Sequence, residues 1–151
     1  MIIVGKYVNT HGIKGEIRIL SDFSRKDLIF KPKFKLYINN KEFIIKSYRK
    51  HKKYDMITFE GINSINDIEY LKGNNVYIRR DDINEFIDED LYKYLISVNS
   101  KLYKIKNILM NNFQKILVLE NDKMVPYVKD FILKKDDEKK IIYMDLPNNL
   151  L

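Results

Sequence analysis

Few side chains in this sequence are arranged for acid–base, nucleophilic or metal chemistry. The chain holds two histidines, His11 and His51, and no cysteine. Neither histidine has a cysteine or a second histidine two to four residues away, which is the spacing of local metal sites. No Gly-x-Ser-x-Gly elbow occurs, and the glycine-flanked segment 12–15 lacks the Lys-Ser/Thr ending of a phosphate-binding P-loop. We therefore expect no enzyme activity, no metal site and no cofactor.

Binding of phosphate groups is the chemistry that the charged residues do favour. Basic side chains gather at residues 46–53, and the polar turn at residues 9–15 adds two more beside glycines that let the backbone approach a ligand. Such side chains neutralise nucleic-acid phosphates. The alternative is a solvated hairpin edge and a plain glycine turn, and the residue types alone leave it open. The RNA-binding candidates are His11, Lys14, Arg18, Arg49, Lys50, His51, Lys52 and Lys53.

Tyrosines accompany several of these basic residues. The chain has 11 tyrosines, and Tyr7, Tyr48, Tyr54 and Tyr77 lie one or two positions from a lysine or arginine. Interleaved rings and cations suit stacking on unpaired bases together with phosphate neutralisation. In small barrels most tyrosines instead pack the ring in the wall and leave the hydroxyl wet, and we expect this role for any single one.

The distribution of charge separates the two halves of the chain. The 151 residues carry 28 Lys and Arg against 21 Asp and Glu, a formal charge of +7. Residues 1–86 hold 17 basic residues, including all five arginines, against 11 acids, whereas residues 87–151 hold 11 lysines against 10 acids. Alanine and tryptophan are absent while Ile, Lys and Asn abound, which indicates the codon drift of an AT-rich genome. Because drift would load lysine evenly, the asymmetry indicates a basic face on the first half.

Composition also excludes several classes of protein. Without cysteine there is no disulfide framework, which suits a reducing cytosol. The apolar stretch at residues 1–4 is broken by Gly5 and Lys6, so we expect neither a signal peptide nor a membrane span. A cytoplasmic protein is the prediction.

Short strands are expected to position these residues. Runs rich in Ile, Val, Tyr and Phe predict strands at residues 2–8, 16–20, 35–38, 42–48, 56–59 and 75–79. Apolar and charged residues alternate over residues 16–19, the pattern of a sheet with one wet face, and Asn39-Asn40 predicts a hairpin turn. Strands this closely spaced favour a closed barrel. A helix over residues 65–71, preceded by Asn63-Ser64 and ended by Gly73, is expected to cover one end.

The second half predicts another small β domain. Strand-like runs occupy residues 101–110, 115–120, 123–125 and 140–145, with a turn signal at Asn121-Asp122. Acidic residues mark a connection before them. The predicted organisation is a first barrel at residues 1–82, an acidic connection at 83–90 and a second barrel at 91–151, with a short tail at 148–151.

Motifs in chain order resemble the bacterial ribosome maturation factor RimM family. The segment GKYVNTHGIKGEIR at residues 5–18 looks like the family's opening signature. Arg49-Lys50-His51, the FEGI segment at 59–62, the DxExLKG segment at 67–73 and VYIRR at 76–80 continue the match. VPYV at residues 125–128 and DLP at 145–147, before Leu150-Leu151, are similar to the family's closing segments.

The resemblance implies a fold and a function. The fold is all-β: a six-stranded barrel like those of translation factors, followed by a PRC-type barrel. The function is that of a non-catalytic assembly factor, which binds the head of the 30S subunit and assists late folding and processing of 16S rRNA. The implied partners are 16S rRNA in the immature 30S subunit and small-subunit ribosomal protein nineteen, with no membrane involved. We expect a monomer.

One stretch departs from the family pattern. Members carry a Tyr-Tyr pair shortly before an Asp-Leu-Ile-Gly stretch, and that pair is associated with docking of the ribosomal protein, whereas Asp90 and Leu91 take those places here. The turn before Leu102 also lacks the expected glycine. The protein-partner candidates are therefore the aromatic residues Tyr92, Tyr94, Tyr127 and Phe131, with core packing as a competing role for the last two. A general single-stranded RNA-binding barrel protein without a dedicated protein partner is the alternative function.

Overall fold

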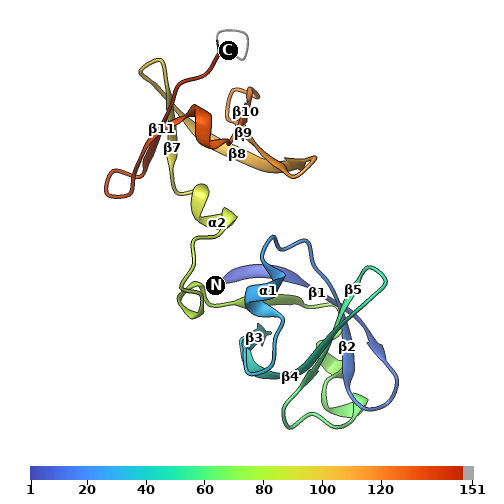
Figure 1. Cartoon of the computed structure of the whole chain (residues 1–151). Helices are drawn as coiled ribbons and strands as arrows, with labels where there is room; N and C mark the ends of the chain where they lie inside the picture. Colours follow the sequence, from blue (N-terminus) through green and yellow to red (C-terminus); the bar gives the residue numbers. More distant parts are fainter. Residues whose placement is uncertain (148–151) are drawn as a thin grey trace. The chain divides into compact units, whose positions relative to one another are not determined.

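A computed structural model describes residues 1–147 of the chain (Figure 1). Its strands form two six-stranded sheets. The chain divides into two units, residues 1–85 and 86–151. The prediction of an all-β protein, with a six-stranded barrel followed by a second β domain, is confirmed. The predicted tail, residues 148–151, lies outside the described residues.

The first sheet closes into a barrel in which every pair of neighbouring strands is antiparallel. Its hydrogen-bonded order is β1-β2-β5-β4-β3-β6, and the closing pair is β6 with β1. Apolar residues at alternate strand positions fill the interior, among them Ile17, Ile19, Ile57 and Ile38, all fully buried. The strands are β1 (Ile2–His11), β2 (Glu16–Leu20), β3 (Lys35–Ile38), β4 (Lys41–His51), β5 (Tyr54–Phe59) and β6 (Asn75–Ile78).

Local sequence explains the turns of this barrel. Asn39 and Asn40 join β3 to β4 with φ of 51° and 61°, the left-handed conformations that a two-residue hairpin turn requires, so the predicted hairpin is confirmed. The short helix α1 (Lys26–Ile29) follows β2 and buries Ile29.

The helix expected over residues 65–71 is wrong in type. The chain forms two 3₁₀ turns, η1 (Ile65–Asp67) and η2 (Glu69–Leu71), and the Ser64 hydroxyl accepts a hydrogen bond from the Asn66 N–H. The apolar residues Ile65, Ile68 and Leu71 recur every third position, which matches the three residues per turn of a 3₁₀ helix. The predicted covering role is retained, because Ile68 and Leu71 are buried.

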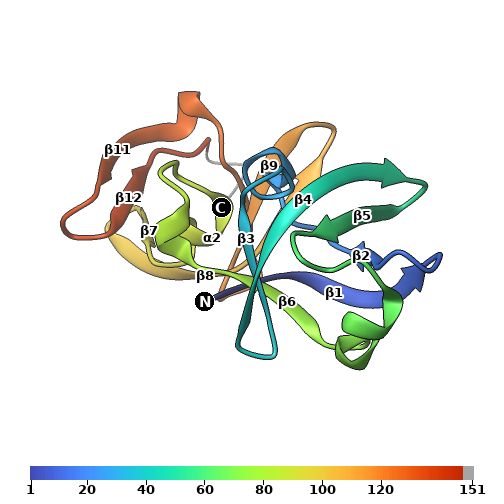
Figure 2. The same cartoon turned by 90° about the horizontal axis from the view of Figure 1, so that it is seen from below.

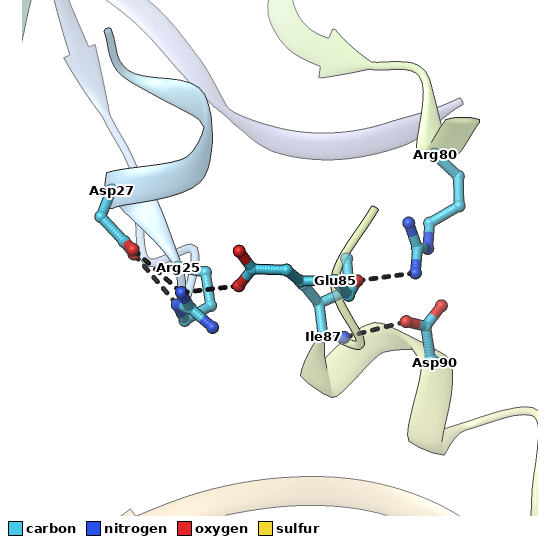
Figure 3. Close-up of polar contacts among 6 residues, drawn as sticks. All are labelled: Arg25, Asp27, Arg80, Glu85, Ile87 and Asp90. Carbon is cyan, nitrogen blue, oxygen red and sulfur yellow. Dashed lines mark hydrogen bonds and ion pairs between the residues drawn. The ribbon is translucent and has the colours of Figure 1, made fainter. Parts of the chain in front are cut away.

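Two arginines fix the last residues of the first unit (Figure 3). The Arg25 guanidinium lies between two carboxylates, donating two hydrogen bonds to Asp27 and one of 3.1 Å to Glu85. Arg80, in the 3₁₀ turn η3 (Arg80–Asp82), donates to the carbonyls of Ile83 and Glu85 at 2.7 and 3.0 Å. The acidic segment is therefore structured by ion pairs and hydrogen bonds at Glu85 rather than fully solvated.

The second unit begins with the short helix α2 (Asp88–Leu91), where the Asp90 carboxylate accepts a hydrogen bond from the Ile87 N–H. Its sheet has the order β10-β9-β8-β7-β12-β11, so β10 and β11 are the two edges. Figure 2 shows the β11–β12 ribbon with β7 beside β12, the one parallel pair among the described strands. The strands are β7 (Leu95–Val98), β8 (Lys101–Asn111), β9 (Gln114–Leu119), β10 (Met124–Pro126), β11 (Ile132–Asp136) and β12 (Ile141–Met144), with the 3₁₀ turn η4 (Lys129–Phe131) before β11.

A separate apolar core lies in this second unit. It includes Leu91, Ile96, Leu117 and Ile142, all fully buried. The edge position of β10 explains how a strand can end in Pro126, since an edge needs no backbone donor on its outer side. None of the helices in residues 1–147 is long and apolar enough to cross a membrane.

Candidate nucleic-acid interface

Register places four of the RNA-binding candidates on one outer face of the barrel. Arg18 of β2 and Arg49 of β4 are both paired with Met56 of the intervening strand β5. His11 pairs with Glu16, and His51 pairs with Tyr54. Since side chains alternate along a strand, these positions share the face opposite the buried Ile17 and Ile57. We call this surface the histidine–arginine face, defined as His11, Glu16, Arg18, Arg49, His51 and Tyr54.

Direct contacts join the members of this face. The Arg18 guanidinium lies 3.0 Å from the His11 Nδ1, and the His11 and His51 rings are 6.2 Å apart between centroids. Arg18 also lies over the Tyr54 ring, 5.6 Å from its centroid. Residues that are forty positions apart in sequence thus form one contiguous surface of imidazole, guanidinium and phenol groups. Such groups suit both phosphate contacts and stacking on unpaired bases.

One carboxylate belongs to this surface, and the sequence pattern did not identify it. Arg49 donates two hydrogen bonds to Glu16, at 2.7 and 3.0 Å. This bidentate pair lowers the pKa of the Glu16 carboxyl below its ordinary value, with Arg49, His11 and His51 all contributing, and raises the pKa of Arg49. The positive charge of Arg49 is therefore largely balanced within the protein. The alternation of residues 16–19 was the signal that could have placed Glu16 beside Arg18 on the wet face.

The β1–β2 turn holds Lys14 at the edge of the histidine–arginine face. Gly12 and Gly15 both have positive φ, and the Ile13 carbonyl accepts a hydrogen bond from the Ile65 N–H at 3.0 Å. Gly15 is also required for space, because a Cβ there would lie 3.0 Å from the Ile62 side chain and 3.2 Å from the Ser64 carbonyl oxygen. Beside the turn is a hollow of about 400 Å³ lined by His11, Gly12, Ile13, Lys14, Glu16 and Thr58.

The β4–β5 turn presents Lys52 and Lys53. Lys52 has a φ of 56°, and the Lys53 ammonium lies over the Tyr54 ring at 5.5 Å. Within residues 1–147, neither of these lysines nor Lys14 forms a salt bridge, so all three ammonium groups are available to an anionic ligand. Lys14 comes from the β1–β2 turn and Lys52 and Lys53 from the β4–β5 turn, and these turns lie at opposite ends of the antiparallel β2–β5 pair.

Lys50 has a different environment, although it lies between Arg49 and His51 in sequence. Its ammonium is 3.6 Å from the carboxylate of Asp55, which is fully buried. The same carboxylate accepts a 2.7 Å hydrogen bond from the Tyr48 hydroxyl and forms an ion pair of 2.9 Å with Lys26. Burial, together with Asp55, raises the pKa of Tyr48 to about 12, so its hydroxyl is a donor at neutral pH. Strand alternation therefore divides the basic run, and Lys50 serves to balance a buried charge.

The remaining tyrosines and arginines of the first unit do not gather on this face. Tyr7 is fully buried, and burial together with Glu69 raises its pKa to about 12. Arg79 lies over the Tyr37 ring at 4.9 Å. Arg25 and Arg80 bind the end of the unit, as described above. The charge asymmetry of the sequence thus overstates the charge of any one surface, because three of the five arginines lie away from this face.

The partner candidates of the second unit differ sharply in exposure. Tyr94 is 4% exposed and donates a 2.6 Å hydrogen bond to Asp137, which lowers the pKa of that carboxyl together with Lys135. Tyr127 and Phe131 are partly buried against the apolar core. Tyr92, with 45% exposure, has its hydroxyl 3.4 Å from the Asn107 amide oxygen. Tyr92 is therefore the candidate whose ring is most accessible.

The part of the chain that the structure describes holds no group of three or more His, Cys, Asp or Glu side chains able to hold a metal ion. The polar groups on the histidine–arginine face are suited to binding an anion or a base by hydrogen bonds and charge.

Comparisons with known proteins find relatives along the whole chain. A family model described as the RimM N-terminal domain matches residues 2–83. A protein named ribosome maturation factor RimM from Staphylococcus aureus (strain bovine RF122 / ET3-1) is 36% identical over 162 residues, covering 98% of this chain and 97% of the relative. The protein of the same name from strain JH9 is 35% identical with the same coverage.

Solved structures were matched as well. A crystal structure of a RimM protein from Pseudomonas aeruginosa covers 98% of both chains with 17% sequence identity and a TM-score of 0.48. The solution structure of the N-terminal domain of RimM from Thermus thermophilus covers 56% of this chain and 94% of that chain, with 15% identity and a TM-score of 0.48.

Proposed function

Because this chain belongs to the RimM family of ribosome maturation factors, we propose that it is a non-catalytic assembly factor for the 30S ribosomal subunit. In this role it binds the head of the immature subunit and assists the late folding and processing of 16S rRNA. It acts in the cytoplasm as a monomer, with no cofactor and no membrane.

The observation that carries the RNA-binding half of this proposal is the histidine–arginine face with its unpaired lysines. Arg18 and the two imidazoles offer hydrogen bonds, Tyr54 offers a ring, and Lys14, Lys52 and Lys53 bring charge from the adjoining turns. Phosphate contacts of this kind concentrate a protein on RNA without reading its sequence.

Salt dependence of binding tests this half of the proposal. Each phosphate contact contributes about −0.7 to −0.9 to the slope of log K against log salt, so the triple variant Lys14→Glu, Lys52→Glu and Lys53→Glu should flatten the slope by about two or more on 16S head rRNA. The control is Lys93→Glu, Lys129→Glu and Lys139→Glu, three exposed lysines of the second unit with the same total change of charge. Equal slopes for the two triple variants would mean that net charge, and not this face, governs binding.

For the protein-binding half, we propose that Tyr92 contacts small-subunit ribosomal protein nineteen. Tyr92→Ala should weaken capture of that protein by about tenfold or more if the ring is an interface anchor. Tyr70→Ala is the matched control, since Tyr70 is 59% exposed on the first unit. Normal capture by the Tyr92 variant would show that Tyr92 does not anchor the contact with the ribosomal protein.

Discrimination between RNAs separates this function from that of a general single-stranded RNA binder. The assembly factor must prefer immature head rRNA over an unrelated RNA of equal length in competition, whereas a general binder would bind both equally. The basic face alone supports either function, and the family membership favours the first.

A further inference from the structure

The β8–β9 hairpin is drawn in orange in Figure 1. Its tip carries a fully exposed aromatic ring. Phe113 is 100% exposed in the turn between these strands. The next most exposed phenylalanine, Phe86, is 45% exposed and lies under the Lys135 ammonium at 4.0 Å. The Phe113 ring therefore buries no apolar surface within the chain, and its exposure to water is unfavourable in free energy.

The backbone at the same residue is also unfavourable for phenylalanine. Asn112 and Phe113 have φ of 50° and 65°, so both central positions of the turn are left-handed. The corresponding turns of this chain use Asn39-Asn40 and Asn99-Ser100, residue types that tolerate this conformation. A bulky side chain at positive φ is an outlier, and such outliers concentrate at functional sites. Neither hydration nor turn geometry accounts for a phenylalanine here.

The strands behind the tip continue the apolar surface. Leu109 of β8 is paired with Ile116 of β9, and Val118 of β9 is paired with Met124 of β10. Since Ile116 and Val118 alternate with the buried Leu117, these four residues share the face of the sheet that is opposite the core. Leu109 and Met124 are exposed, and Ile116 and Val118 are partly so. An apolar stripe therefore crosses three strands next to the exposed ring.

The charges of the hairpin indicate the class of partner. Residues 105–119, all of them described, contain no acidic residue and two lysines. Lys106 is paired with Asp122 at 2.6 Å, and Lys115 is paired with Asp88. Both lysines of this segment are therefore ion-paired, so nucleic acid would gain little electrostatic attraction at the tip of the hairpin. An uncharged apolar tip is complementary to an apolar recess on a protein, and aromatic side chains are the usual anchors of such contacts.

We propose that the β8–β9 hairpin is a protein-docking element in which Phe113 inserts into an apolar recess of the partner, with the stripe Leu109, Ile116, Val118 and Met124 flanking it. The proposal rests on the proposed function in that it takes the partner to be a protein of the immature small subunit. The Tyr92 hydroxyl is 3.4 Å from Asn107 of β8, so the same strand carries both the hairpin tip and the contact of the exposed tyrosine.

Binding of the full chain to immature 30S particles tests this proposal by sedimentation. Phe113→Asn should weaken binding at least tenfold, because the anchor is lost. The same variant should keep or raise the thermal midpoint by about 2–5 °C, because asparagine suits the left-handed turn. Leu133→Asn, at a residue 68% exposed on β11, is the matched control and should bind as wild type does. Unchanged binding by the Phe113 variant would overturn the proposal.

Photo-crosslinking identifies the molecule that the tip contacts and does not depend on the stability of the asparagine variant. Phe113→p-benzoylphenylalanine should give an adduct with a ribosomal protein that resists nuclease and is destroyed by protease. An adduct only with rRNA, or none while the particle is bound, overturns the proposal and leaves the proposed function intact. Failure of the wild-type chain to sediment with the particles would count against the proposed function instead. In that case, the same crosslinking with purified 30S proteins would test the docking role of the hairpin. The absence of an adduct with these proteins would also overturn the proposal.

Discussion

At the scale of single residues, Glu16 controls how much charge the histidine–arginine face can offer. Its carboxylate accepts both hydrogen bonds from Arg49 and lies near His11 and His51. The half-exposed Arg49 side chain is held in one orientation by this pair, and part of its positive charge is balanced by the Glu16 carboxylate. The sequence identified the cations of this surface, but the carboxylate that balances one of them became visible only through the register of β2, β5 and β4.

The lowered pKa of Glu16 predicts how the stability of the protein depends on pH. A carboxyl whose pKa is lower in the folded chain stabilises the fold above its ordinary pKa of 4.5, and this contribution is lost as pH falls through the lowered value. Glu16→Gln should therefore lower the free energy of unfolding at pH 7 by up to about 1 kcal/mol. The gap to wild type should close as pH falls below the lowered pKa. Urea denaturation over a series of pH values from 7 into the acid range measures it, and a gap that stays constant would contradict the assigned pairing.

Two glycines of the β1–β2 turn permit a matched comparison of conformation and space. Gly12 and Gly15 both have positive φ, but a Cβ would meet nothing within 4 Å at Gly12, whereas at Gly15 it would press on Ile62 and Ser64. Gly12→Ala should cost about 1 kcal/mol of stability from backbone conformation alone. Gly15→Ala should cost about 1–3 kcal/mol more, because its neighbours must move. Urea unfolding of both variants checks this, and equal losses would show that the turn does not pack as described.

At the scale of secondary structure elements, alternation along β4 decides which basic residues act together. The sequence shows a dense run at residues 46–53, and a run is naturally interpreted as one patch. In the strand, Arg49 and His51 face outward on the histidine–arginine face, whereas Lys50 turns to the buried Asp55 beside Lys26 of α1. The partner of Lys50 is set by the register of β4 with β5, which places Lys50 opposite Asp55, so the run could not be divided from the local sequence alone.

Other elements also show how far a local sequence pattern can predict secondary structure. The six strands of the barrel were predictable because each shows a local apolar pattern, and the Asn39-Asn40 turn was predictable from its chemistry. β7 (Leu95–Val98) and β11 (Ile132–Asp136) were not predicted as strands. β11 carries Lys134, Lys135 and Asp136, so its local sequence lacks an apolar run and its strand state depends on pairing with β12.

The division of the basic run predicts different consequences for two nearby lysines. Lys50→Gln should lower the free energy of unfolding by up to about 1 kcal/mol, because Asp55 loses one of its cations, and should leave the salt dependence of RNA binding nearly unchanged. Lys52→Gln should leave stability within about 0.5 kcal/mol of wild type and reduce the salt slope by about one. Urea unfolding and RNA titrations over a range of salt measure both. The reverse pattern would show that Lys50, not Lys52, faces the RNA.

At the scale of the whole molecule, the two units differ in the interactions that their surfaces can make. Residues 1–85 form a closed barrel with a polar, cationic outer face, and residues 86–147 form a sheet that exposes Tyr92, Phe113 and an apolar stripe among near-balanced charges. Each unit has its own buried core, which is the property that lets a domain fold independently. Figure 3 shows that the first unit is also fixed at its C-terminal border, where Arg25 and Arg80 hold Glu85.

A chain divided in this way should yield two fragments with separable binding. Residues 1–85 hold 17 basic residues against 11 acids, and residues 86–151 hold 11 against 10. The first fragment should unfold cooperatively by itself and keep most of the salt slope of the full chain on 16S head rRNA, because the slope counts the phosphate contacts, which the proposed function assigns to the barrel. The second fragment should bind that RNA too weakly to give a slope, yet crosslink from position 113 to a protein of the immature subunit. Titration of each fragment over a range of salt tests the division. If the second fragment carried the slope, the electrostatic contacts would have to lie on its lysines, and the assignment of the histidine–arginine face to RNA would be wrong even though the chain remained a ribosome maturation factor.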